Sequence, residues 1–193
     1  MASAGTTSPT RREQILATAA ELFAARGFHG VSVSDLGAAC GISGPALYKH
    51  FVSKDAVLAE MLVSISERLL SVGRERVAAA DGDPGAALRA LVDWHVDFAL
   101  RHRALIVVQD RDWESLPVEA REQVRALQRA YVDLWAAEHR RLVPDASLGA
   151  ARARAHAVCG LINSTPHSGR LPDEEMRVLL TDMALGAWGV PTG

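Results

Sequence analysis

The chain has 193 residues, of which 49% are hydrophobic, and its formal net charge is −2. This length and composition are enough for one large or two small folded domains, and they exclude a largely disordered chain. The small net charge excludes a uniformly basic nucleic-acid-binding protein, so any DNA-binding surface must be local.

The first ten residues, MASAGTTSPT, contain no apolar run. We therefore expect residues 1 to about 8 to form a mobile arm rather than a signal peptide, and no later run reaches the length of a membrane span. A cytoplasmic protein is expected. Cys40 and Cys159 are far apart and lie in predicted helices, which favours buried, inert thiols, with a redox sensor as the alternative.

The first predicted helix begins after Thr10. Thr10 and Glu13 form a capping box, apolar residues then recur at helical spacing, and Gly27 ends the helix. Arg11 and Arg12 stand at its exposed start. They either contact a DNA phosphate or are simply solvated.

Two short helices joined by a tight turn are predicted next. Ser32 can cap one and Ser43 the other, and Gly41 supplies the left-handed turn between them. This arrangement is typical of a helix-turn-helix, whose second helix lies in the DNA major groove. Both lysines of the chain, Lys49 and Lys54, fall in this region, which suits phosphate contact.

The rest of the chain predicts further helices and no strands. Ser164–Leu171 is predicted as a loop before the last of them. Together with the first three this gives about nine helices in an all-α chain. The later helices are predicted to begin at or directly after Ser53, Pro84, Pro117, Ser147 and Pro172, with a short apolar segment at Ala104–Val108.

Two segments resemble the DNA-binding domain of the TetR family of transcriptional regulators, namely GFHGVSVSDLGAACGIS (Gly27–Ser43) and ALYKHFVSKDAVL (Ala46–Leu58). The Leu-Tyr-x-His-Phe-x-x-Lys core of the second is the family's most specific pattern. With the helix before them, the segments cover about a quarter of the chain. The resemblance implies a DNA-binding domain at 1–53 and a helical ligand-binding and dimerisation domain at 54–193.

The resemblance also assigns DNA contacts to individual residues. Tyr48 and Lys54 match phosphate contacts of the family, and Ser34 and His50 lie where backbone or base contacts are common. Phosphate contacts fix the register of a protein on DNA, and base contacts specify the sequence. The residues expected to face the bases are Ser43, Gly44, Pro45, Ala46 and Lys49.

Two of these residues suggest how the bases are read. Lys49 can contact O6 and N7 of guanine, and the Ala46 methyl group can contact a thymine methyl. Gly44 departs from many relatives, because it places no side chain where a base-reading residue often stands. We therefore expect part of the specificity to come from DNA shape.

The middle helices hold more aromatic bulk than a tight alanine-rich bundle needs. We hypothesise that several of these residues line an apolar cavity for a small ligand, with His95 or a nearby arginine at its polar end. A packed core is the alternative for each one. The candidates are Trp94, His95, Phe98, Trp113, Tyr131 and Trp135.

The last two predicted helices are the candidate dimer interface, mainly because of the resemblance. Ala157 and Gly160 allow close approach of helices, and Leu161, Leu180 and Met183 supply apolar contact. The alternative is that abundant alanine merely reflects composition. A two-fold dimer would span two half-sites about 34 Å apart.

Catalytic and metal-binding patterns are weak. The sequence has no nucleophile elbow, phosphate loop or dinucleotide-binding motif, so no enzyme activity and no cofactor are expected. His95 and His102 stand about two helical turns apart and suggest no metal site. The acidic stretch Gln109–Asp112 is interpreted as a solvated corner.

The sequence thus predicts a homodimeric, ligand-responsive DNA-binding regulator, a repressor rather than an activator. It would release a palindromic operator on binding a small apolar effector of unknown identity. The long helix that starts at Lys54 touches both domains and is expected to transmit the signal. The alternative is an all-helical small-molecule or acyl-group binding protein, or an enzyme, in which the helix-turn-helix is vestigial.

Overall fold

The computed structural model describes residues 9–168 and 170–190, so the predicted arm at residues 1–8 lies outside the described residues. Within the described ranges the chain forms helices and no strands, which confirms the all-α prediction. The elements are α1 (Arg11–Arg26), α2 (Val33–Ala39), α3 (Gly44–Leu47), α4 (Lys54–Ala79), α5 (Pro84–Arg101), α6 (Arg103–Asp112), the 3-10 turn η1 (Trp113–Ser115), α7 (Val118–Leu142), α8 (Leu148–Ile162), α9 (Thr165–Ser168) and α10 (Asp173–Trp188).

Several helices begin at the predicted capping residues. The hydroxyl groups of Thr10 and Ser32 each accept from a backbone N–H three residues on, and Glu13 and Asp35 close the two capping boxes. Gly41 has a φ of +66°, as the predicted left-handed turn requires. Each cap contributes about 1 kcal/mol. The side chains that cap α3, α4 and α8 are those of Ser43, Ser53 and Ser147.

Two short helices differ from the prediction. The regular part of α3 ends at Leu47 rather than near Phe51, although the Phe51 N–H still donates to the Leu47 carbonyl at 3.0 Å. Helix α9 lies within the segment predicted as a loop. It is anchored by the buried hydroxyl group of Thr165, which donates to the Ala99 carbonyl at 3.2 Å. A single turn held by such a distant contact leaves no periodic pattern in the sequence.

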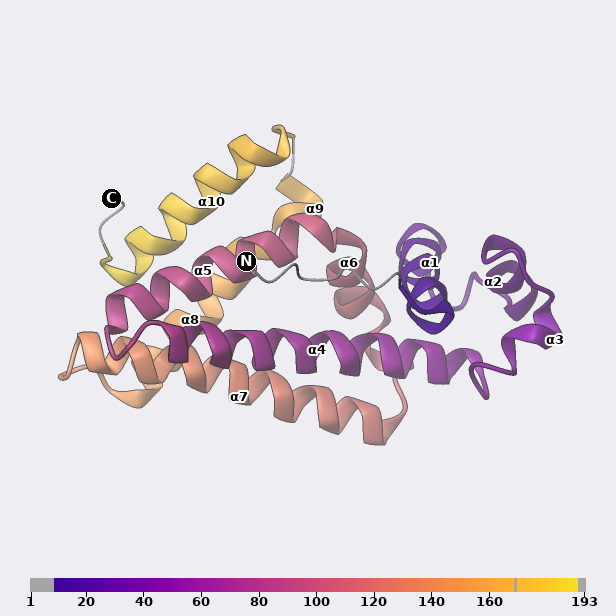
Figure 1. Ribbon diagram of the computed structural model, residues 1–193, viewed down its shortest axis with the longest axis horizontal. Coiled ribbons are helices and arrows are strands. Elements are labelled where there is room, and N and C mark those ends of the chain that lie inside the picture. Colours follow the sequence, from indigo (N-terminus) through magenta and orange to yellow (C-terminus); the bar gives the residue numbers. More distant parts are fainter. Residues whose placement is uncertain (1–8, 169, 191–193) are drawn as a thin grey trace, which may run out of the picture.

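The molecule is elongated, and α4 runs along most of its length (Figure 1). Helices α1, α2 and α3 lie at one end of the molecule. The bundle formed by α5, α7, α8 and α10 lies toward the other end. Helix α6 packs against α1 and so stands between the two ends. No helix of the described residues is both long enough and apolar enough to span a membrane.

Two hydrophobic cores divide the fold. The N-terminal core contains α1, α2 and α3, and it extends into α4 through residues 57–62 and into α6 and α7 through Val108 and Val124. The second core lies in the bundle, where the rings of Trp135 and Trp188 stack with their centroids 5.7 Å apart. The two regions are therefore joined by shared packing as well as by the chain.

Gly73 lets α4 approach α7 closely. A Cβ at this position would lie 2.9 Å from Cε2 of Tyr131 and 3.2 Å from Cδ2 of Leu134. We expect Gly73→Ala to lower the free energy of unfolding by about 1 kcal/mol, because overlap with a buried ring outweighs the better helix propensity of alanine. Urea denaturation measures this change.

The matched control is Gly149→Ala in α8. Gly149 is exposed, and its added Cβ would meet no atom closer than the Ser147 hydroxyl oxygen at 4.0 Å. This variant should be as stable as the original chain or slightly more stable. An equal gain in stability at both glycines would contradict the close packing inferred at Gly73.

Candidate DNA-binding surface and ligand cavity

Close backbone packing fixes the helix-turn-helix. Gly37 of α2 is buried against the start of α3, and a Cβ there would lie 2.9 Å from both the Gly44 nitrogen and the Ile42 carbonyl oxygen. A larger residue would force α2 and α3 apart. The sequence analysis did not single out Gly37, because nothing in a sequence marks which glycine meets another backbone.

The predicted DNA contacts gather around α3, at the end of the molecule that lies away from the bundle (Figure 1). The side chain of Tyr48 is 55% exposed, although it is large and aromatic. Gly44, Ala46 and His50 are half-buried. The other exposed residues of this set are Ser34, Ser43, Pro45 and Lys49.

Lys49 differs from the other cations of this region. Among the lysine and arginine side chains of residues 9–54, it alone forms no ion pair or hydrogen bond with another described residue. Its ammonium group is therefore available to a phosphate or to a base edge.

Arg11 and Arg12 both bind other residues of the chain. The sequence analysis considered phosphate contact and simple solvation for them, and it did not predict these contacts. Nη2 of Arg11 donates to the Cys40 carbonyl at 2.5 Å. Arg12 pairs with Glu60, donates to the His50 carbonyl and lies over the Phe51 ring, 4.2 Å from its centroid. Both arginines therefore tie α1 to the helix-turn-helix.

Lys54 holds the loop between α1 and α2. Its Nζ donates to the carbonyl oxygens of Phe28 and Val31, each at 2.8 Å, and lies 4.2 Å from the centroid of the Phe28 ring. Two of the three ammonium N–H groups are thus used within the chain. The phosphate contact predicted for Lys54 stays a prediction, and a single N–H remains for it.

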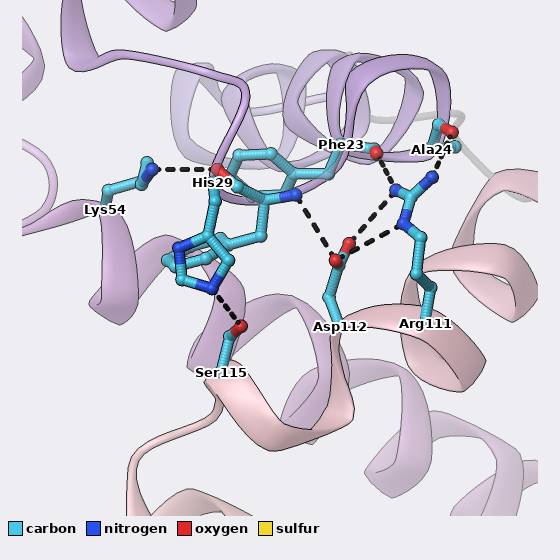
Figure 2. A network of polar contacts seen from close by, with 8 residues as sticks. Phe23, Ala24, His29, Lys54, Arg111, Asp112 and Ser115 are labelled. Carbon is cyan, nitrogen blue, oxygen red and sulfur yellow. Dashed lines mark hydrogen bonds and ion pairs between the residues drawn. The ribbon is translucent and has the colours of Figure 1, made fainter.

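The interpretation of Gln109–Asp112 as a solvated corner fits the exposed Asp110 but is wrong for Asp112. Asp112 is buried, and its Oδ1 accepts from the Phe28 N–H at 3.3 Å. Arg111 pairs with Asp112 at 3.1 Å and donates through Nη1 to the Ala24 carbonyl at 3.0 Å and through Nη2 to the Phe23 carbonyl (Figure 2). The last carbonyl groups of a helix carry partial negative charge and mostly lack intrahelical partners, so they attract a guanidinium group. The Phe23 carbonyl also accepts from the Gly27 N–H at 2.8 Å.

Further along the same segment, the Ser115 hydroxyl lies 3.0 Å from Nε2 of His29 (Figure 2). We call the contacts made by Arg111, Asp112 and Ser115 the α6–α1 clamp. The clamp joins the end of α6 to the end of α1 and to the loop that follows it.

A cavity of about 250 Å³ lies between α4, α5, α6, α7 and α8. Of the six predicted ligand residues, the structure places His95, Phe98 and Tyr131 on its wall. The other three predicted residues lie elsewhere. Trp94 donates to the Leu69 carbonyl at 3.3 Å, Trp113 packs on the N-terminal core, and Trp135 is fully buried against Trp188.

A hydrogen-bonded chain of three side chains crosses the cavity wall. Nε2 of His95 lies 3.1 Å from Oδ1 of Asn163, and Nδ1 lies 3.2 Å from the Tyr131 hydroxyl. Because Oδ1 can only accept, Nε2 carries the proton and Nδ1 accepts from the tyrosine O–H. Burial lowers the pKa of His95 to about 4, so the imidazole is neutral at pH 7.

Other polar residues of the wall were missed by the sequence analysis. Gln109, Gln128, Cys159 and Asn163 come from three different helices or their ends and form no motif. Burial raises the pKa of the Cys159 thiol to about 12, so it is no thiolate at neutral pH. Within the part of the chain that the structure describes, no group of three or more His, Cys, Asp or Glu side chains is placed to hold a metal ion.

The exposed faces of α8 and α10 contain most of the predicted dimer contacts. Ala157 and Gly160 are exposed, and a Cβ at Gly160 would meet nothing within 4 Å. Met183 is 47% exposed and Leu161 is half-buried. Leu180 is a correction, because it is buried in the core of its own chain and offers no surface to a partner.

The fold and these sites define a two-domain, helix-turn-helix DNA-binding protein with an internal cavity. Residues 15–61 match the family described as "Bacterial regulatory proteins, tetR family", and residues 81–187 match "Tetracyclin repressor-like, C-terminal domain". The chain belongs to the TetR family of bacterial transcriptional regulators. It is therefore a DNA-binding regulator rather than an enzyme.

Two curated relatives are similar to much of the chain. The HTH-type transcriptional repressor KstR2 of Rhodococcus jostii is 32% identical over 126 residues, which are 65% of this chain and 61% of that protein. The HTH-type transcriptional activator FasR of Mycolicibacterium smegmatis is 31% identical over 186 residues, which are 93% of this chain and 82% of that protein.

Solved structures share the fold. A TetR-family transcriptional regulator from Bordetella parapertussis superposes with a TM-score of 0.80 at 24% identity, covering 96% of this chain and 100% of that one. The TetR-family regulator PfmR from Thermus thermophilus gives a TM-score of 0.75 at 28% identity, covering 89% and 97% of the two chains.

The two lysines allow a matched test of the site. Lys54→Met should lower the free energy of unfolding by about 1–3 kcal/mol, because the Val31 carbonyl loses its donor and the Phe28 carbonyl keeps only the Val31 N–H at 3.4 Å. Lys49→Met should change it by less than about 0.5 kcal/mol, since Lys49 is exposed and unpaired. Urea denaturation followed by circular dichroism measures both, and equal losses would contradict the role given to Lys54.

Proposed function

We propose that this regulator is a homodimeric repressor that acts in the cytoplasm and releases a palindromic operator when a small, mostly apolar molecule occupies the cavity. One observation carries the proposal. Helix α6 places Ile106 and Gln109 on the cavity wall and, within the next turn, Arg111 and Asp112 in the α6–α1 clamp. A ligand that displaces α6 therefore acts directly on the position of α1.

The clamp supports release by a shift between two populations. An effector changes DNA affinity only if it binds one arrangement of the domains better than the other. Helix α4 contributes as well, because Lys54 at its start holds the loop after α1. Both α4 and α6 therefore line the cavity and also contact the loop that follows α1.

A dimer gives two copies of α3 the spacing of two operator half-sites. The exposed faces of α8 and α10 support this assembly, since the small residues Ala157 and Gly160 on α8 and the apolar side chains of Leu179 and Met183 on α10 are all exposed. Repression is favoured because KstR2 is named a repressor, while the name of FasR makes activation the alternative.

Salt-dependent DNA binding tests the proposal. Sites are selected from random duplex DNA with the full-length protein, and affinity for the selected site is measured at rising salt. We expect a palindromic site and an affinity that falls by about 10³ to 10⁵ between 50 and 200 mM salt, because bound phosphates release counterions. Failure to select any site, or a flat salt dependence, would refute DNA-binding repression by this chain.

A pair of variants tests the dimer in the same assay. Met183→Asp places a charge on the exposed face of α10 and should give a monomer with much weaker binding to the palindrome. Val118→Asp changes an exposed apolar residue at the start of α7 and should leave both properties intact. Sedimentation measures the assembly, and a dimeric Met183→Asp protein would place the interface elsewhere.

The clamp makes a separate prediction. Arg111→Met should speed hydrogen exchange of the Phe28 amide by about ten-fold, because Asp112 loses the cation that orients its carboxylate. Arg141→Met, which removes contacts to Glu138 and Gly82 far from α1, should leave that amide unchanged. Exchange measured by mass spectrometry or NMR decides, and unchanged protection in Arg111→Met would remove the clamp from the mechanism.

A further inference from the structure

The chemistry of the cavity wall restricts the ligand beyond "small and apolar". We propose that the cavity binds an uncharged alcohol whose hydroxyl group donates to the oxygen of Tyr131. The ligand would have about ten non-hydrogen atoms, because a cavity of about 150 Å³ holds benzene and this one has about 250 Å³. This inference rests on the proposed function, because it names the effector class of that same cavity.

The wall offers no charge to pair with an ionised ligand. None of the described residues that line the cavity is a lysine, arginine, aspartate or glutamate. His95 is neutral, and burial raises the pKa of Tyr131 well above its usual value. His156 also lines the cavity, but it is exposed on α8, where water competes for it. A buried carboxylate would therefore stay unpaired, which costs several kcal/mol.

At the Tyr131 oxygen, the direction of the hydrogen bonds favours an alcohol over a ketone, although the amide groups of Gln109, Gln128 and Asn163 elsewhere on the wall also hold N–H donors. Asn163 Oδ1 accepts from His95 Nε2–H, and Nδ1 in turn accepts from the Tyr131 O–H. The tyrosine proton is thus already used, and its oxygen has lone pairs left for a donor. A hydroxyl group of the ligand supplies such a donor. A ketone and a carboxylate supply only acceptors.

The remaining wall is apolar enough to hold a hydrocarbon chain. Ile65, Leu69, Phe98, Ile106 and Leu127 come from four helices and face the same space. A molecule with one hydroxyl group and an alkyl body therefore matches both parts of the wall. The alkyl body also touches α6 through Ile106, which is within two turns of the clamp.

Three probes of equal size test the ligand class with the full-length protein. They are 1-nonanol, 2-nonanone and octanoate, each with about ten non-hydrogen atoms. Isothermal calorimetry should show 1-nonanol binding about five-fold more tightly than 2-nonanone, the difference expected for one net hydrogen bond. Octanoate should show no binding. Octanoate binding as tight as that of 1-nonanol would overturn the proposal.

Tyr131→Phe removes the oxygen and keeps the ring. We expect it to lower the affinity for 1-nonanol about five-fold and to leave the affinity for 2-nonanone unchanged. A general loss of packing would weaken both probes alike, and that result would overturn the role of the hydroxyl group. The ratio of the two affinities is therefore the decisive quantity.

A gain-of-function pair keeps the test independent of Tyr131. Gln128→Lys adds a cation to the wall one turn from Tyr131 and should create octanoate binding that the original chain lacks. Gln123→Lys, on the exposed part of the same helix and outside the cavity, should not. No octanoate binding by Gln128→Lys would overturn the argument from missing charge.

The two proposals fail separately. Absence of binding by 1-nonanol, with salt-dependent DNA binding intact, would overturn the ligand class and leave the regulator. Binding of 1-nonanol without any selected DNA site would support the cavity chemistry and remove the proposed repression.

Discussion

The structure depends on how the carbonyl groups at the end of α1 and in the following loop are satisfied. Helix ends leave such groups without intrahelical partners. Here Arg111 reaches the carbonyls of Phe23 and Ala24 from α6, and Lys54 reaches those of Phe28 and Val31 from α4. The DNA-binding domain is therefore oriented by hydrogen bonds from two helices that both continue to the cavity, and neither helix can move without disturbing this loop.

Buried polar groups are also paired in the wall of the cavity. His95 is buried and uses both ring nitrogens, on Tyr131 and on Asn163, which keeps a neutral imidazole in one tautomer. The network leaves the tyrosine oxygen as an acceptor, on a wall whose other polar groups include the amides of Gln109, Gln128 and Asn163. Ligand selectivity then follows from which polar group of the ligand completes the network, since an acceptor placed there would leave two acceptors facing each other.

The sequence was sufficient for features set by neighbours along the chain. The capping boxes at Thr10 and Ser32 and the left-handed Gly41 depend on residues within one turn. It was insufficient where the partner is distant. Lys54 was expected to face DNA, and Asp112 was expected to face water, yet each binds a loop that lies far away in the chain. A charged side chain is exposed in most proteins. Here, backbone groups of a distant loop bind these two side chains, and nothing in the local sequence indicates that contact.

The aromatic residues show the same limit on a smaller scale. Tyr131 and Trp135 lie one turn apart on the same face of α7, so periodicity cannot separate them. Tyr131 lines the cavity, whereas Trp135 stacks on Trp188 in the core of the bundle. The difference is set by α10, which closes the core over Trp135 but does not contribute to the cavity wall.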